Sequence, residues 1–236
     1  MSEPVRLSKC LIAQLGCSRR EAELFIEGGW VTVDGVVIEQ PQFKIDQQRV
    51  ELLPGARAEP LAPVTLLLNQ PAGQWLEEAR ASITMASLGT TQPSDIRPLH
   101  GHFARQECVA ALPPGASGLQ VFTQDWRTKR KIEADLRKLE QEFIIEVRGS
   151  ATPQALERLA RGLVRDGREL PKAKVSWQNE THLRLAIKAP QPGTIGELCS
   201  ALKLEIVSLR RIRLGGVPMG KLPVGQWRYV GSHERF

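Results

Sequence analysis

The chain has 236 residues, of which 42% are hydrophobic, enough for one large domain with its own core and a small appended domain. Lysine and arginine outnumber aspartate and glutamate by 32 to 26. The protein should therefore be attracted to polyanions, although a charge of this size is also common in proteins that bind no nucleic acid. No secretion signal and no membrane-spanning apolar stretch is visible, so we expect a cytoplasmic protein without membrane contact.

The cysteines are Cys10, Cys17, Cys108 and Cys199. None belongs to a CxxC pair or has histidine partners at metal-ligand spacing, which argues against a zinc site and against a disulfide framework. We expect thiols buried in a reducing compartment and no metal ion. His100 and His102 have no third ligand nearby in the sequence, so we interpret them as surface or core side chains.

The first sixty residues predict two helices followed by a hairpin. Residues 7–15 have apolar side chains at helical spacing, and Gly16 ends that run. Ser18 then opens a second helix, with Glu21 three residues later as in a capping box. Beyond this helix, two alternating apolar runs flank Asp34-Gly35, which is the strongest short signal for a hairpin.

Prolines at positions 54, 60 and 63 interrupt regular structure, and the apolar strand Val64–Leu68 opens a new segment. We therefore place the domain boundary near residue 60. Beyond it we expect strands at 119–123, 143–147 and 183–187, and helices at 127–140, 153–164 and 194–202. This mixture predicts an α+β domain rather than a doubly wound sheet.

The landmark residues of the first segment are Arg6-Leu7-x-Lys9, Ser18-Arg19-Arg20-x-Ala22, Ile26 and Gly29-x-Val31-x-Val33-Asp34-Gly35. This pattern resembles the RNA-binding domain named after the fourth small-subunit ribosomal protein, here called the S-four type. Ser18 would open a helix whose free N–H groups, with Arg19 and Arg20, present positive charge to a phosphate. Arg6 and Lys9, one turn apart, would add to that charge. The alternative is an ordinary cap and surface charges on a small helical domain.

Further segments recur in the same order as in another family. They are Leu68-Asn69-Gln70-Pro71-Ala72-Gly73, Ser117-Gly118-Leu119-Gln-Val-Phe-Thr123-Gln-Asp125, Leu209-Arg-Arg211-Ile-Arg213-Leu-Gly215 and Leu222-Pro-x-Gly225-x-Trp227-Arg228. They resemble the motifs L-N-K-P-x-G, T/S-G-L-x-x-x-T-x-D and L-x-R-x-R-I-G of rRNA pseudouridine synthases of the RsuA and RluF type. Those enzymes join the same RNA-binding module to a catalytic domain, so the resemblance covers nearly the whole chain.

The resemblance implies a mechanism without a cofactor, in which one Asp of a G-R-L-D-x-x-T/S-x-G-L loop attacks the target uridine. Counting back from Gly118, the family's Arg and Asp fall on Ala111 and Pro113, so the nucleophile is missing. The family's strand tyrosine falls on Phe143, which keeps a ring but has no hydroxyl. The basic partner of the catalytic Asp falls on Glu197, a reversal of charge.

Another carboxylate would have to replace the lost one for catalysis to persist. The nearest in sequence are Asp95, in a proline-bounded loop, and Asp125, which matches a family position distant from the reacting atoms. Phe143 would either stack on a base or fill the core, and core packing is the favoured reading.

We therefore expect an α+β protein, in which residues 1–60 form a small helical and β-hairpin RNA-binding domain. Residues 61–236 would form a pseudouridine-synthase-like domain with a mixed, mainly antiparallel sheet. The protein would act as a monomer on structured RNA, either rRNA or a ribosomal particle, without a cofactor and without catalysis. Arg211 and Arg213 are expected on one face of a strand, where they would contact phosphates. The alternative is an active rRNA pseudouridine synthase with a displaced carboxylate.

Overall fold

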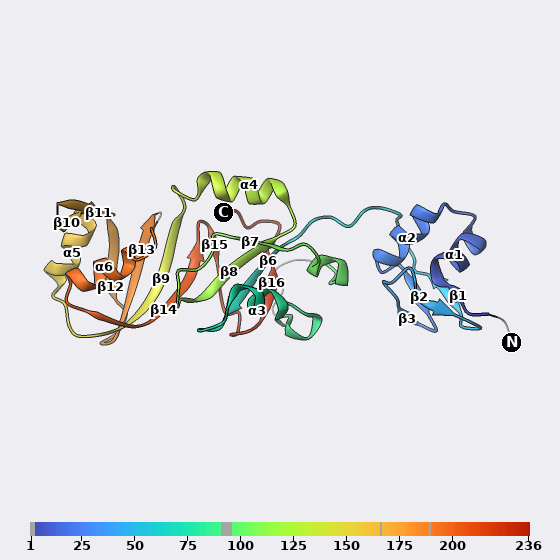
Figure 1. Cartoon of the computed structure of the whole chain (residues 1–236), viewed down its shortest axis with the longest axis horizontal. Coiled ribbons are helices and arrows are strands. Elements are labelled where there is room, and N and C mark those ends of the chain that lie inside the picture. The colour runs from blue at the N-terminus through green and yellow to red at the C-terminus, as the bar shows by residue number, and fades with distance from the viewer. Residues whose placement is uncertain (1–2, 91–95, 166, 189) are drawn as a thin grey trace. The chain divides into compact units, whose positions relative to one another are not determined.

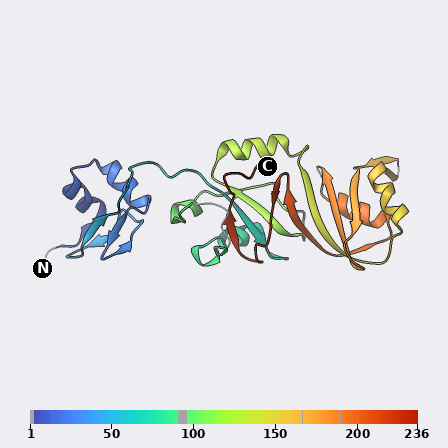
Figure 2. The same ribbon diagram turned by 180° about the vertical axis from the view of Figure 1, so that it is seen from behind.

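The computed structural model describes residues 3–90, 96–165, 167–188 and 190–236 (Figures 1 and 2). The chain forms two compact units. Unit 1 contains the residues up to Pro63 together with Arg97–Arg105, and unit 2 contains Val64–Ile96 and Gln106–Phe236. The domain boundary near residue 60 stays a prediction; the structure adds that a segment from farther along the chain packs with the first unit.

Unit 1 combines two helices with short antiparallel strands. Its elements are β1 (Val5–Arg6), α1 (Leu7–Leu15), α2 (Arg19–Glu27), β2 (Val31–Val33), β3 (Val36–Val37), β4 (Lys44–Ile45) and β5 (Val50–Leu52). Strand β1 pairs with β4, and the order β3-β2-β5 forms a second small sheet. The core contains Leu7, Leu11, Ala22, Ile26, Val31, Val33, Ile45 and Val50.

The local signals of unit 1 are confirmed. Gly16 ends α1 in the left-handed region with φ of 66°, where glycine carries no Cβ penalty. Ser18 and Glu21 form the capping box of α2, each accepting a hydrogen bond from the other's backbone N–H. Asp34 and Gly35 both have positive φ, and β2 and β3 pair directly on either side of them, as a two-residue hairpin turn requires.

Residues 97–105, here called the strap, cover part of unit 1. The Arg97 guanidinium lies 5.8 Å from the centroid of the Trp30 ring and donates a hydrogen bond to the carbonyl of Gly29. At His100, both the backbone N–H and the ring Nδ1 lie within 3.0 Å of the Glu39 carboxylate. Since these contacts join residues more than sixty positions apart, no local pattern predicts them.

Unit 2 is built on one large sheet. Its elements are β6 (Thr65–Gln70), α3 (Leu76–Ala81), β7 (Glu107–Val109), β8 (Ser117–Thr123), α4 (Trp126–Asp135), β9 (Glu140–Arg148), α5 (Pro153–Arg161), β10 (Leu163–Arg165), β11 (Arg168–Leu170), β12 (Ala173–Trp177), β13 (His182–Lys188), α6 (Thr194–Ala201), β14 (Glu205–Leu214), β15 (Val217–Pro218) and β16 (Trp227–Tyr229); 3-10 turns occupy Met85–Ser87 in this unit and His100–Phe103 in the strap.

The large sheet has the strand order β12-β13-β9-β14-β8-β6-β16, with β15 paired to β14 and β7 paired to β8. Strands β14 and β8 run parallel, and the other ladders of this sheet in the described part of the chain are antiparallel. The expected α+β fold with a mixed, mainly antiparallel sheet is therefore confirmed.

Two expected helices are shorter than their sequence patterns predict. Helix α4 ends at Asp135 rather than near 140, where β9 begins. Helix α5 ends at Arg161, because Gly162 turns the chain with φ of 104° and Leu163 starts a small β10-β11 hairpin. The sequence patterns did not predict that hairpin.

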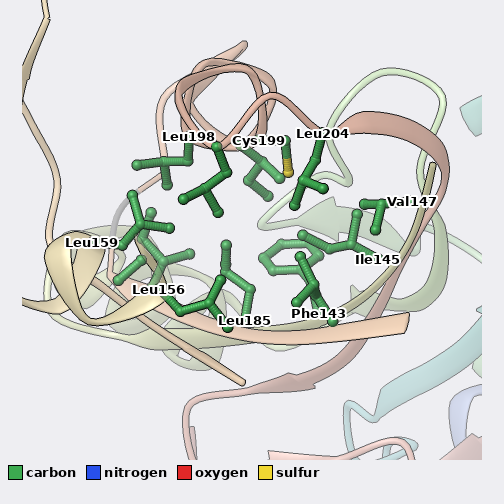
Figure 3. Packing of buried hydrophobic residues seen from close by; sticks show 14 of the residues in the cluster. Phe143, Ile145, Val147, Leu156, Leu159, Leu185, Leu198, Cys199 and Leu204 are labelled. Atoms are coloured by element: carbon green, nitrogen blue, oxygen red, sulfur yellow. The ribbon is translucent and has the colours of Figure 1, made fainter. Parts of the chain in front are cut away.

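One face of the sheet packs against α5 and α6 (Figure 3). Phe143 lies fully buried in this cluster, among Ile145, Leu185, Leu198 and their neighbours. The favoured reading of Phe143 as a core residue is thus confirmed. A second cluster on the other side of β14 includes Leu67, Leu119, Ile132 and Leu214.

Candidate RNA interface and catalytic pocket

The start of α2 presents backbone donors and cations to solvent. The Ser18 hydroxyl oxygen accepts from the Glu21 N–H at 3.2 Å, while the Ser18 N–H donates to the Glu21 carboxylate at 2.8 Å. The N–H groups of Arg19 and Arg20, in the first turn, have no acceptor within the helix. An anion can therefore be bound there by backbone N–H groups and by the positive end of the helix dipole.

The side chains around this helix start are all exposed. Arg19 forms an ion pair with Glu23 one turn later, at 2.8 Å and with 80% of the Arg19 side chain accessible; such a pair is weak and a phosphate can displace it. Arg6 precedes α1 and Lys9 lies in its first turn. No hydrogen bond or ion pair within the described chain joins Arg6 or Lys9 to the Ser18–Arg20 group.

Pro113 lies in a pocket of about 410 Å³ in unit 2. The pocket is lined by Pro113, Pro114, Gly115, Pro190, Gln191, Gly193, Ile195, Gly196, Ile206, Val207, Ser208 and Leu209. None of the lining residues in the described part of the chain is acidic. Ala111 is exposed at the same loop.

The carboxylates considered from sequence have other positions. Asp125 caps α4, accepting hydrogen bonds from the N–H groups of Arg127 and Thr128 and from the Thr128 hydroxyl. Burial alone would raise the pKa of Asp125, but these hydrogen bonds outweigh it and lower the pKa below its ordinary value. Glu197 lies in the first turn of α6, 3.7 Å from the Arg168 guanidinium. Asp95 lies outside the described residues.

Sequence reasoning missed one carboxylate that touches the pocket wall. Glu146 of β9 accepts a hydrogen bond at 3.0 Å from the hydroxyl of Ser208, which lines the pocket. The two residues lie opposite each other across the β9-β14 ladder. They are 62 positions apart, and only the strand register, which no local pattern specifies, could have revealed the contact.

Arg211 is fully buried and anchors the loop that carries Pro113. Its guanidinium donates to the Leu119 carbonyl at 2.9 Å, to the Gln141 side-chain oxygen at 3.0 Å and to the Ala110 carbonyl at 2.6 Å. Burial lowers the pKa of Arg211 to about 10, so the group stays charged near pH 7. Its expected contact with a phosphate is not available in this structure, because no part of the side chain reaches solvent.

The expectation that Arg211 and Arg213 share one strand face is wrong. The ladder between β14 and β9 shifts register between these two residues, so Arg211 lies opposite Phe143 and Arg213 opposite Glu142. This bulge turns the two arginines to opposite sides of the sheet. Arg213 donates instead to the carboxylates of Glu142 and Glu140, at 2.9 and 2.6 Å.

Glu142 also pairs with Arg184 of β13. The hydrogen bond from Arg184, together with the one from Arg213, lowers the pKa of Glu142 against the opposing effect of burial. Arg213 therefore has two acidic partners, and a phosphate would have to compete with both of them.

Comparisons with known proteins agree with this architecture. A family model described as the S4 domain matches residues 5–50. The chain is 25% identical to ribosomal small subunit pseudouridine synthase A of Vibrio cholerae, over 98% of this chain and 97% of that protein. It is 25% identical to the dual-specificity RNA pseudouridine synthase RluF of Escherichia coli, over 98% of this chain and 77% of that protein.

A plant relative is longer. The putative chloroplastic ribosomal large subunit pseudouridine synthase SVR1 of Arabidopsis thaliana is 28% identical over 91% of this chain, which spans only 55% of that protein. Among solved structures, a pseudouridylate synthase matches with a TM-score of 0.59 and 16% identity over 96% of each chain, which shows the fold. By these matches the chain is similar over nearly its whole length to pseudouridine synthases of the RsuA and RluF type, and its residues 5–50 match the S4 domain.

Proposed function

We propose that this protein binds structured RNA of ribosomal origin through its S4 domain and does not isomerise uridine. The observation that carries the proposal is the pocket beside Pro113, which keeps about 410 Å³ of space but has no carboxylate among its described lining residues. A proline side chain has no nucleophilic atom and no proton to transfer. The pocket could therefore accommodate a base, but Pro113 could not attack the sugar of that nucleotide.

The surroundings of the lost nucleophile support the same conclusion. Ala111 and Gln70 stand where the family has a basic side chain, and the family's cationic partner of the Asp is replaced by Glu197, which lies beside Arg168. Phe143 carries no hydroxyl and is enclosed in the core. A site that stabilised a carboxylate would need a cation near it, and these substitutions remove the acid and its positive neighbours together.

RNA binding is supported by separate features. The S4 match covers the capping box of α2 with its exposed Arg19 and Arg20. Two relatives that match over 98% of this chain are named as a ribosomal small subunit pseudouridine synthase and a dual-specificity RNA pseudouridine synthase. We propose rRNA, free or within a ribosomal particle, as the partner of a cytoplasmic monomer.

A second candidate function rests on Glu146. Its carboxylate binds the pocket-lining Ser208, so a small shift of the Ser208 side chain would bring an acid to the pocket wall. In that case the protein would be an active synthase whose nucleophile comes from β9 rather than from the loop of Pro113.

The deciding experiment is pseudouridine mapping. Total rRNA from cells with and without the gene is mapped by mass spectrometry and carbodiimide modification, and purified protein is incubated with transcribed, unmodified rRNA. The proposal expects no pseudouridine that depends on this protein. A dependent pseudouridine that disappears with Glu146→Gln would establish the second function instead. Glu205→Gln is the matched control, because Glu205 is an exposed acid of the paired strand β14 and forms an ion pair with Arg148.

The RNA-binding part has its own test. Replacing Arg19 and Arg20 by alanine should weaken binding to rRNA fragments and reduce the slope of log Kd against log salt concentration. The reduction should be about 0.7–0.9 for each phosphate that the variant no longer neutralises. An unchanged slope would refute the assignment of this helix start as a phosphate site.

A further inference from the structure

Helix α4 (Trp126–Asp135) has an outer face that the fold leaves uncovered. Ile132 is its buried residue, and the helix packs inward against β7 and β8. In both ribbon views no other element of unit 2 lies over its outer side (Figures 1 and 2). The side chains that point away from Ile132 therefore meet solvent.

Three of the exposed side chains of α4 are basic, and one, Glu133, is acidic. Arg127 and Lys131 are one turn apart, and Arg130 is one turn from Trp126, so the four residues form two adjacent rows on the same face. All four are exposed. We call Trp126, Arg127, Arg130 and Lys131 the α4 face.

The three cations of the α4 face form no ion pair within the described chain. By contrast, Lys129 on the inner side binds Glu107 of β7, which fixes the helix to the sheet. Since no intramolecular ion pair has to be broken, Arg127, Arg130 and Lys131 are available to an external anion.

The excess of basic residues lies in residues 61–236, the part of the chain that contains the α4 face. Residues 1–60, with the S4 match, hold seven basic and nine acidic side chains, so residues 61–236 hold 25 and 17 of the chain's 32 and 26. Residues 1–60 are thus slightly acidic overall, and the S4 match at residues 5–50 carries no net charge. Attraction to a polyanion, which depends on many phosphates at once, must come largely from residues 61–236, which include α4.

Trp126 places a large aromatic side chain on the exposed side of α4. Its side chain is 63% exposed, and the Arg127 guanidinium lies 5.5 Å from the centroid of the Trp126 ring, over one side of it. The cation holds the ring in place. An exposed aromatic ring beside cations is the arrangement on which unpaired bases stack.

From these observations we propose that the α4 face is a second RNA-contact surface, separate from the S4 domain. Arg127, Arg130 and Lys131 contact backbone phosphates, and an unpaired base stacks on Trp126. The proposal rests on the proposed RNA binding and goes beyond it, because it names a surface that neither the S4 match nor the pocket contains.

The test uses the full chain and a fluorescein-labelled rRNA hairpin with an unpaired loop, titrated between about 50 and 200 mM KCl. The triple variant Arg127→Gln, Arg130→Gln, Lys131→Gln should raise Kd at least tenfold and lower the salt slope by about two to three. The matched control, Arg158→Gln with Lys172→Gln and Lys174→Gln, removes the same charge from exposed positions on and near α5 and β12. It should leave the slope within about one of the wild type.

Stacking is tested separately with Trp126→Ala and Trp126→Phe. The alanine variant should weaken binding of the looped hairpin by about fivefold or more, with little effect on a fully paired duplex, and the phenylalanine variant should restore most of the affinity.

The outcomes separate this proposal from the one it rests on. If the Arg19 and Arg20 variant loses affinity while the α4 triple variant binds like its control, RNA binding stands and the α4 face is not a contact surface. If the wild-type chain fails to bind the hairpin and other rRNA fragments at low salt, both proposals are refuted.

Discussion

Replacing Arg211 by methionine should destabilise unit 2 by a few kilocalories per mole. Its buried guanidinium makes three hydrogen bonds to neutral acceptors: the carbonyls of Leu119 and Ala110 and the side chain of Gln141. Hydrogen bonds from a charged donor contribute about 1.5–3 kcal/mol each. The pKa lowered to about 10 corresponds to about 3 kcal/mol of desolvation that methionine would avoid. The lost hydrogen bonds outweigh the avoided desolvation, so the free energy of unfolding should fall by about 2–6 kcal/mol in Arg211→Met.

The assay is urea denaturation of the full chain, followed by tryptophan fluorescence, to which the buried Trp227 of unit 2 contributes. Arg210→Met is the control, because the side chain of the neighbouring Arg210 makes no hydrogen bond or ion pair within the described chain; the change should alter the free energy of unfolding by less than about 1 kcal/mol. A loss below about 1 kcal/mol for Arg211→Met would refute the view that this arginine holds the loop of Pro113.

Three further changes test the packing of unit 2. Gly118→Ala should cost about 3–5 kcal/mol in urea denaturation, because Gly118 has φ of 95° and an added Cβ would lie 2.3 Å from the Arg211 carbonyl oxygen. Ala110→Gly should stabilise by about 0.5–1 kcal/mol, since Ala110 has φ of 50°; no gain would contradict this.

The third change, Glu234→Gln, tests how the stability of the fold depends on pH. Burial raises the pKa of Glu234, but hydrogen bonds from Arg228 and from a backbone N–H outweigh it, so the folded pKa lies below the ordinary 4.5. The stabilisation is therefore complete above about pH 4.5 and is lost as the pH falls through the folded pKa. Glu234→Gln should be about 2–4 kcal/mol less stable at pH 7 and should lose less stability on acidification than the wild type; parallel pH profiles would contradict this.

Features fixed by local chemistry were predictable from sequence. The capping box of Ser18 and the Asp34-Gly35 turn depend on residues within a few positions of each other, and both form as expected. The α+β class follows from alternating patterns along the chain, and the fold confirms it.

Features that depend on pairing between distant strands were not predictable. The bulge that separates Arg211 from Arg213 is a property of the register between β14 and β9. The contact between Glu146 and Ser208 arises from that same ladder. Alternation along a single strand assumes an unbroken ladder, and here that assumption fails at the residues where function was expected.

Because the strap belongs to unit 1, the ribosome completes unit 1 only after it has synthesised part of unit 2. The surface around Gly29 and Trp30 is completed by Arg97 and Leu99, so this unit is assembled from two stretches separated by residues 64–96. At about 5–20 residues per second, the ribosome needs about 2–8 s to pass from residue 63 to residue 105. During that interval Arg97 and Leu99 have not yet been added, so the surface around Gly29 and Trp30 has no cover until the strap is synthesised.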